Sequence, residues 1–463
     1  MTARSLLFAA GIASAWLASP AAAAPPDGVG QGIPGMQVHR IREPVYQSET
    51  YVYETGRDKS RSIVLVHGLG DEGASSFYTI VPWLREHYHV VTFELPGFAR
   101  ATKANLAYAP TGYAMFVKYV VDKYVGQRPF VLLGHSMGGV IALRYAATFP
   151  AGIEKLVLVD TPGIVHRASF SSQFLTHLLS NYTRDYVPPV VNTQGKANGI
   201  AQQLVTRLEQ FNLDPEIVHA SPQLRTKVLG GNPLAIAGYG IVLEDFSNVL
   251  PSLKVPTLVI WGANDTLAPP RTGRFLATTI PGAQLAVIAS AGHVPMIENP
   301  QAFRSTLEPF LNGEPVPAPA ATPMRRHGNV RCQGKHNQVF EGEYEELILR
   351  QCDGAQIRNA RIGMLRVFDS AITIDQSQIG GGEIGLHAHN ATIVMTGGTI
   401  TGETAIYALN SRLDVAATRI RAGHSAMTAP VASSLIATMS EIESPRQRGA
   451  LHGAFNVVPG KPL

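Results

Sequence analysis

One serine lies where the chain must turn sharply between two regular elements. In the run Gly134-His135-Ser136-Met137-Gly138, a short apolar segment precedes the serine and a helix-forming segment follows it. This is the Gly-x-Ser-x-Gly pattern, in which a tight strand-to-helix turn holds the hydroxyl above the edge of a sheet. The two glycines allow close backbone approach, and the Met137 N–H at the start of the helix can bind a developing oxyanion. The pattern therefore predicts that Ser136 is a nucleophile.

A serine hydroxyl is a weak nucleophile at neutral pH and needs a base that an acid holds in place. The chain offers both in the order serine, acid, histidine, each after an apolar run. Asp265 follows the run in "PTLVIWGAND", and His293 follows the run in "LAVIASAGH". Asp160, at the end of "KLVLVD", is the main alternative for the acid. We expect Ser136, His293 and Asp265 to form a catalytic triad.

The other polar residues near these motifs are predicted to support the site rather than to react. His135 is a neighbour of the nucleophile that points from the wrong side of the turn to act as its base. His67 is predicted to be structural. Glu94, Glu244 and Asp245 are predicted to be solvated or to serve packing.

A mostly parallel sheet must position these groups. Six runs are nearly continuous in Val, Ile and Leu, which is typical of parallel strands that are buried on both faces. Because these runs alternate with helical patterns, they predict an α/β fold. The runs are "SIVLVHG", "HVVTFELPG", "FVLLGHS", "KLVLVDTP", "TLVIWGAND" and "QLAVIAS". An insertion at about 163–250 is predicted to be a helical cap, because apolar residues recur at helical spacing in "FSSQFLTHLLSNY". A helical excursion with its own small core is the alternative.

Residues 60–312 resemble a serine-dependent α/β-hydrolase of the esterase or lipase type, on the three motifs above and their order. In "LVHGLGDEG", the resemblance implies that the Leu69 N–H is the second oxyanion donor and that His67 and Gly68 shape its turn. One segment departs from the family. The usual Asp-x-Pro-Gly-x-Gly-x-Ser loop reads "ELPGFARA" here, which leaves the fold intact and the subfamily open.

The resemblance implies a small-molecule ester or acyl substrate and no cofactor. A serine nucleophile excludes the dehalogenase and epoxide-hydrolase branches of the superfamily, which have Asp at the position of the nucleophile. Esters are favoured, but a peptidase, thioesterase, acyltransferase or carbon–carbon hydrolase would use the same triad. A non-catalytic binding protein with a vestigial hydrolase fold is the third interpretation, which the intact order of the triad disfavours.

The segment 325–463 contains a repeat with a period near 20 residues and short alternating β patterns. Three apolar columns share its register, and they predict stacked coils of a β-solenoid. The columns are Leu365, Leu386, Ile406 and Met427; Ile372, Ile393, Leu413 and Leu435; and Ile379, Ile400, Ile420 and Ile442.

The turns of this repeat carry further signals. Asp369, Asn390 and Asn410 share one column, which predicts a polar ladder. Cys332 and Cys352 are one period apart, so a disulfide between neighbouring coils is expected. The segment resembles an all-β, right-handed parallel β-helix; a leucine-rich repeat is less favoured because no helical half-repeat appears.

The repeat segment shows neither stacked carboxylates nor His and Cys residues at metal-ligand spacing. We therefore expect no metal site and a structural or binding role, as a platform that binds or anchors a glycan, envelope material or another partner. Fold alone does not decide this role.

Length and the N-terminus complete the predicted organisation. A chain of 463 residues is too long for one ordinary core. Residues 1–24 have a basic start, an apolar core and a small-residue end, the layout of a secretory signal peptide. The hydrolase domain is predicted over 25–312 and a Pro/Ala linker over 313–324. We expect export to the periplasm or beyond, no further transmembrane segment and, at a formal charge of +4 without a basic run, no nucleic-acid partner.

Overall fold

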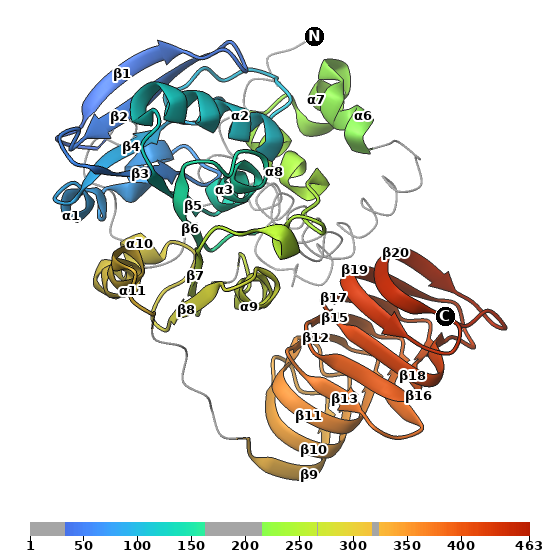
Figure 1. Ribbon diagram of the computed structural model, residues 1–463. Helices are drawn as coiled ribbons and strands as arrows, with labels where there is room; N and C mark the ends of the chain where they lie inside the picture. Colours follow the sequence, from blue (N-terminus) through green and yellow to red (C-terminus); the bar gives the residue numbers. More distant parts are fainter. Residues whose placement is uncertain (1–32, 163–214, 266, 317–323) are drawn as a thin grey trace, which may run out of the picture. The chain divides into compact units, whose positions relative to one another are not determined.

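The computed structural model describes residues 33–162, 215–265, 267–316 and 324–463 (Figure 1). The chain divides into two compact units, Met1–Pro319 (unit 1) and Ala320–Leu463 (unit 2). The predicted signal peptide, the first part of the predicted cap and most of the predicted linker lie outside the described residues.

Unit 1 is built on an eight-stranded sheet with the order β1-β2-β4-β3-β5-β6-β7-β8. Neighbouring strands from β4 to β8 run parallel, whereas β1 and β2 form an antiparallel edge. The six predicted apolar runs form β3 to β8, and β1 and β2 were not predicted. The strands are β1 (Gln37–Arg42), β2 (Glu49–Thr55), β3 (Arg61–Val66), β4 (Tyr88–Phe93), β5 (Phe130–His135), β6 (Ile153–Val159), β7 (Thr257–Gly262) and β8 (Gln284–Ile288).

Helices cover both faces of this sheet, which is why its central strands are apolar throughout. Side chains such as Val131 and Leu133 pack into a core shared with η2, α1, α10 and α11. Helices α3 and α9 contact β5, β6 and β7, and α2 packs beside α3 (Figure 1). These elements are η2 (Gly73–Phe77), α1 (Val81–Leu84), α2 (Pro110–Val120), which continues as η3 (Val121–Val125), α3 (Met137–Thr148), α9 (Pro270–Thr279), α10 (Pro295–Glu298) and α11 (Pro300–Asn312).

The described part of the predicted cap is helical. It contains α6 (Pro215–Ala220), α7 (Pro222–Leu229), α8 (Pro233–Leu243) and the turn η4 (Leu250–Ser252). Helix α8 packs on α2 and α3. The Glu244 carboxylate accepts hydrogen bonds from the Arg144 guanidinium and from Thr111, so this acid fastens the end of α8 to both helices. Asp245 accepts hydrogen bonds from Ser247.

Unit 2 is a single sheet of mostly parallel strands that return in register after each repeat (Figure 1). All three predicted columns are aligned, with Leu365 beside Leu386 and Ile372 beside Ile393, for example. Their side chains are buried in one core. The strands are β9 (Arg326–Gln333), β10 (Val339–Arg350), β11 (Ala355–Phe368), β12 (Ala371–Asp375), β13 (Gln378–Gly380), β14 (Ile384–His389), β15 (Thr392–Thr396), β16 (Thr399–Leu409), β17 (Arg412–Ala416), β18 (Arg419–Thr428), β19 (Ser433–Glu443) and the antiparallel β20 (Arg448–Val457).

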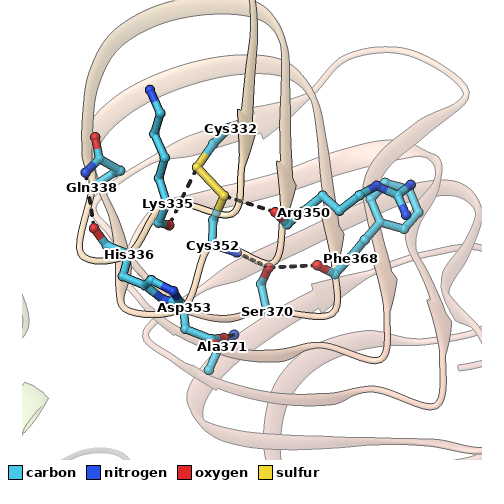
Figure 2. Close-up of a disulfide and its surroundings, with 10 residues drawn as sticks. All are labelled: Cys332, Lys335, His336, Gln338, Arg350, Cys352, Asp353, Phe368, Ser370 and Ala371. Carbon is cyan, nitrogen blue, oxygen red and sulfur yellow. Dashed lines mark hydrogen bonds between the residues drawn. A yellow bond between two sulfur atoms is a disulfide. The ribbon is translucent and has the colours of Figure 1, made fainter.

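The turns of unit 2 are joined from coil to coil. Asn390 Nδ2 donates to Asp369 Oδ1 at 3.0 Å, and Asn410 Nδ2 donates to Asn390 Oδ1 at 2.9 Å, which is the predicted ladder. All three residues have φ between 46° and 50°, the left-handed region that Asn and Asp tolerate best among residues other than Gly. Figure 2 shows the disulfide between Cys332 and Cys352, one repeat apart.

No helix within the described residues has the length and apolar character needed to cross a membrane.

Candidate active site

The candidate site forms where the parallel strands of unit 1 end. Ser136 follows β5, Asp160 follows β6, Asp265 follows β7 and His293 follows β8. The carboxyl ends of parallel strands meet at one edge of a sheet, so residues far apart in the sequence come together there.

Ser136 occupies a strained turn between β5 and α3. Its φ is 52° and its ψ is −124°, a conformation that costs a residue with a β-carbon on the order of 1–3 kcal/mol. The turn also requires close packing. A β-carbon on Gly134 would lie 2.1 Å from the Gly138 carbonyl oxygen, and one on Gly138 would lie 2.0 Å from the Val66 oxygen. Both glycines of the motif are therefore needed to hold Ser136 in this position.

His293 contacts both other members of the predicted triad. Its Nε2 lies 2.9 Å from Ser136 Oγ, and its Nδ1 lies 2.8 Å from Asp265 Oδ2. With the Nδ1–H donated to the carboxylate, Nε2 is free to accept the serine proton. The side chains of Ser136 and Asp265 are buried, and the His293 side chain is 19% exposed. The structure thus brings together all three residues in the geometry of a nucleophile, base and acid.

Backbone donors fix the two loops that carry the acid and the base. Asp265 Oδ1 accepts the N–H groups of Leu267 and Ala268 at 2.8 and 2.9 Å. On the other loop, the Glu298 carboxylate accepts the N–H groups of Gly292 and Val294, the residues on either side of His293. Sequence reasoning missed Glu298; its place five residues after the histidine was the one available signal.

The predicted oxyanion donors are the backbone N–H groups of Met137 and Leu69. Met137 is the first residue of α3, so its N–H has no partner within the helix. Leu69 follows Gly68 in the loop after β3. A β-carbon on Gly68 would lie 2.9 Å from the Ser136 β-carbon, which places this loop directly against the serine.

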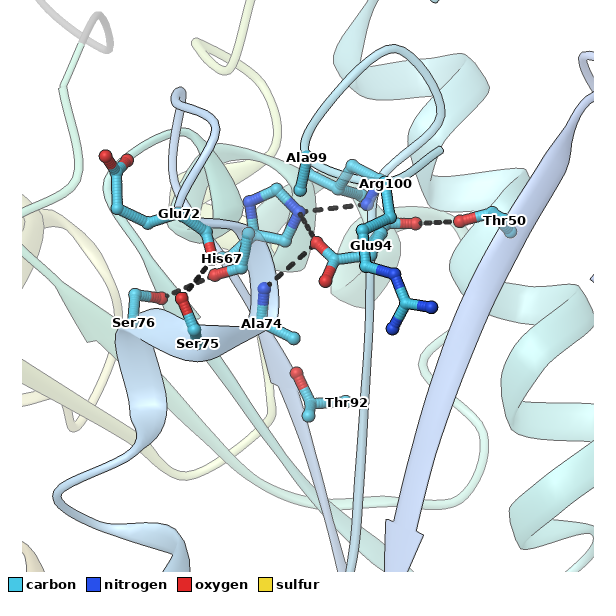
Figure 3. A network of polar contacts seen from close by, with 12 residues as sticks. Thr50, His67, Glu72, Ala74, Ser75, Ser76, Thr92, Glu94, Ala99 and Arg100 are labelled. Carbon is cyan, nitrogen blue, oxygen red and sulfur yellow. Dashed lines mark hydrogen bonds and ion pairs between the residues drawn. The ribbon is translucent and has the colours of Figure 1, made fainter. Parts of the chain in front are cut away.

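His67 lies in a network of polar contacts beside Glu94 (Figure 3). Its Nδ1–H donates to the Gly68 carbonyl at 2.7 Å, and its Nε2 accepts the Leu95 N–H at 2.9 Å. Burial lowers the pKa of His67 to about 4, so the ring is neutral at pH 7 and supports both hydrogen bonds. This agrees with its predicted structural role.

Glu94 lies beside His67 in the same network and is buried rather than solvated (Figure 3). Its carboxylate accepts the Tyr53 hydroxyl at 2.9 Å and the Ala74 N–H at 3.2 Å. Burial raises the pKa of Glu94 to about 7. Glu94, at the position where the resemblance implies aspartate, therefore contacts the start of η2, which follows the loop that contains Leu69.

His135 supports the histidine loop rather than acting as a base. Its Nε2–H donates to the His293 carbonyl at 2.7 Å, and its ring centroid lies 5.2 Å from that of His293. Burial, followed by the charge of His293, lowers the pKa of His135 to about 3. The prediction that it is a motif neighbour did not foresee this contact, which depends on the fold of a loop 158 residues away.

A triad acid accepts the Nδ1–H of the histidine, and here Asp265 rather than Asp160 makes this contact with His293. On spacing alone, Asp160, Asp265 and His293 could hold a cation, because one ligand atom from each lies within 4.8 Å of the others. Both ring nitrogens of His293 are hydrogen-bonded within the site, so this geometry leaves the ring no lone pair for a metal.

The comparison with family models agrees with this fold. The family model described as "alpha/beta hydrolase fold" matches residues 61–300, which are 240 of the 463 residues, and the chain belongs to this family. Lipase 1 of Psychrobacter immobilis is 27% identical over 263 residues, covering 55% of this chain and 80% of the lipase. Lipase 3 of Moraxella sp. (strain TA144) is 27% identical over 252 residues, covering 54% and 77%. The solved structure of a thermophilic esterase from Thermogutta terrifontis is 23% identical with a TM-score of 0.44, covering 60% of this chain and 98% of that one.

Proposed function

We propose that this α/β-hydrolase cleaves carboxylic esters through an acyl-enzyme on Ser136. The observation that carries the proposal is the position of the His293 ring, hydrogen-bonded to Ser136 Oγ on one side and to Asp265 on the other. Two relatives named as lipases support an ester as the bond that is cleaved.

The geometry supports the following sequence of steps. His293 Nε2 takes the proton as Ser136 Oγ attacks the ester carbonyl, and Asp265 stabilises the imidazolium that forms. The N–H groups of Met137 and Leu69 bind the oxyanion of the tetrahedral intermediate. The imidazolium then protonates the departing alcohol. Water repeats the sequence on the acyl-enzyme, releasing the acid and restoring Ser136.

A panel of p-nitrophenyl esters of increasing acyl length, run beside a thioester and an anilide, tests the bond type. We expect the highest kcat/KM on one of the esters and none with Ser136→Ala. A preference for the thioester or the anilide would reassign the enzyme to thioesterase or peptidase chemistry on the same triad. Full activity in Ser136→Ala would refute the nucleophile.

We also propose that the protein is exported, and two observations support this. The N-terminal residues have the layout of a signal peptide, and the Cys332–Cys352 disulfide is of a kind that persists in oxidising compartments. Fractionation of the producing cells, with N-terminal sequencing of the mature chain, tests it. A full-length chain retained in the cytosol would contradict export.

Unit 2 is proposed to be a right-handed parallel β-helix that binds an acidic glycan. The support is a row of outward-facing rings and cations on adjacent coils, here called the aromatic–basic face. The Arg350 guanidinium lies 4.4 Å from the Phe368 ring centroid, Phe368 lies 5.4 Å from His387, and His387 lies 5.2 Å from Tyr407. Aromatic faces can stack on sugar rings, and guanidinium groups pair with carboxylates. The face consists of Arg350, Phe368, His387, His389, Tyr407 and Arg366, whose guanidinium forms an ion pair with Glu346 at 2.9 Å.

Affinity electrophoresis of the full chain in a gel containing a uronic-acid polymer tests this role. We expect retardation that Phe368→Ala and Tyr407→Ala weaken and that Arg419→Ala, on another strand, leaves unchanged. Equal mobility with and without the polymer would contradict glycan binding.

A further inference from the structure

Asp160 is a buried carboxyl group that has no role in the proposed mechanism. It follows β6, is fully buried and has a φ of 43°, in the left-handed region. Its N–H donates to the Ile260 carbonyl at 3.0 Å, and its Oδ1 accepts the Gly262 N–H at 2.9 Å. The backbone of β7 therefore fixes Asp160 at two points, one on its backbone and one on its side chain.

The other carboxylate oxygen of Asp160 has no donor among the described residues. Its neighbour is the carboxyl group of Asp265: one oxygen of each carboxyl group and one His293 ring nitrogen all lie within 4.8 Å of one another. An ionised carboxylate only accepts hydrogen bonds, so two ionised groups in this position would repel each other, and both are buried. The pair is compatible with burial only if one of them keeps a proton.

The hydrogen bonds that the two carboxyl groups accept indicate which of them keeps the proton. Asp265 accepts two backbone N–H groups as well as the Nδ1–H of His293, all of which stabilise a negative charge. Asp160 receives a single backbone N–H. Burial and the nearby charge of Asp265 raise the pKa of Asp160 well above its ordinary value, and Glu298, the other acid near it, acts in the same direction.

We propose that Asp160 is a neutral carboxylic acid that donates a hydrogen bond to Asp265 and so holds the carboxylate in line with His293. It is a positioning residue, since it reaches the reacting atoms only through Asp265. The inference rests on the proposed triad for its catalytic meaning, but the proton on Asp160 does not depend on the substrate.

Two substitutions separate a neutral donor from an ionised acid. Asp160→Asn keeps the shape, the zero charge, a donor toward Asp265 and an acceptor for the Gly262 N–H. Asp160→Ala removes the donor. We expect Asp160→Asn to stay within about threefold of the wild-type kcat with an unchanged pH profile of kcat/KM. Asp160→Ala should lose about tenfold in kcat with little change in KM, the effect of one lost hydrogen bond on the triad.

The rate constant for reaction of Ser136 with a fluorophosphonate should likewise be close to wild type in Asp160→Asn and lower in Asp160→Ala. This second assay makes the result independent of which ester is used as substrate. The exposed Asp58→Asn variant is the matched control and should match wild type in both assays. Folding of each variant is checked by its thermal unfolding curve.

An Asp160→Asn variant as inactive as Asp265→Asn would overturn the proposal and make Asp160 an ionised acid of the triad. A fully active Asp160→Ala would also overturn it.

Infrared difference spectroscopy provides a readout that needs no activity. The spectrum of wild type minus Asp160→Asn at pH 7 should contain the carbonyl band of a protonated carboxylic acid. Absence of the band would overturn the proposal even if the enzyme is active. Presence of the band in a chain that neither hydrolyses esters nor reacts with the fluorophosphonate would refute the proposed function and leave the proton on Asp160 in place.

Discussion

In unit 2 a polar contact made in one coil is made again in the next, whereas each polar contact of the site in unit 1 occurs once. Asp369, Asn390 and Asn410 share the same backbone conformation and the same bond to the neighbouring coil. Ser136 and Asp160 also have positive φ values, but each lies in a different environment and contacts different partners. Repetition points to a role in stability, and a unique, buried and strained polar group points to chemistry.

The comparison predicts that substitutions in the two units will have separable effects. Those at the site should remove activity and leave unfolding almost unchanged. Those in the turns of unit 2 should weaken its fold and leave the chemistry intact. The predictions below test this separation, beginning with the largest effect.

His293→Ala should lower kcat by about 10⁵-fold, because the serine then has no base. The measurement is steady-state hydrolysis of the best ester from the panel, with thermal unfolding recorded for the same sample. His87→Ala, which changes an exposed histidine, is the control and should be as active as wild type. A loss smaller than tenfold in His293→Ala would contradict the assignment of the base.

Removal of the disulfide should affect unit 2 alone. The double variant Cys332→Ala/Cys352→Ala frees a loop with a sequence separation of 20 residues, which lowers the free energy of unfolding by ~3 kcal/mol. Denaturant titration of wild type and variant measures the loss. Hydrolysis at low denaturant should stay within twofold of wild type, and a parallel fall in activity would show that the two units are not independent.

Glu94 should make the stability of unit 1 depend on pH. Its pKa is about 7 in the folded chain against an ordinary value of 4.5, so folding takes up a proton between these values. This stabilisation is fully present below about pH 4.5 and is lost as pH rises through about 7, a change on the order of 2–3 kcal/mol. Glu94→Gln, which resembles the protonated form, should gain stability relative to wild type between pH 5 and pH 8. A difference that is constant with pH would contradict the raised pKa.

The smallest effect is expected at the ladder. Asn390→Ala removes two side-chain hydrogen bonds and the residue type that tolerates a φ of 50°, which should lower the free energy of unfolding by about 1 kcal/mol. Asn390→Gly loses the bonds but keeps the conformation and should fall between alanine and wild type. Equal free energies of unfolding for wild type, Asn390→Ala and Asn390→Gly would show that the ladder does not stabilise unit 2.

The sequence was most informative where one signal was repeated or tied to a motif. The columns of unit 2 could be aligned because each apolar position recurs, and the spacing alone gave the register later found between Leu365 and Leu386. In unit 1, the Gly-x-Ser-x-Gly pattern and the order of the acid and histidine led to three residues that the structure brings within hydrogen-bonding distance.

The features that were not predicted depend on contacts between distant segments. Strand β1 reads "QVHRIR" and forms an edge, so most of its side chains are exposed and no apolar run marks it. Burial of Glu94 follows from the packing of Tyr53 and Ala74 around it, and no linear pattern reports that packing. The relation of Asp160 to Asp265 arises because β6 and β7 are neighbours in the sheet, although the two residues are far apart in the sequence.

Fluorophosphonate labelling of the intact chain, followed by identification of the modified peptide by mass spectrometry, tests the central claim most directly. The account predicts one adduct, on Ser136, that disappears in Ser136→Ala and forms far more slowly in His293→Ala. An adduct on a different residue, or a labelling rate that does not depend on His293, would contradict it.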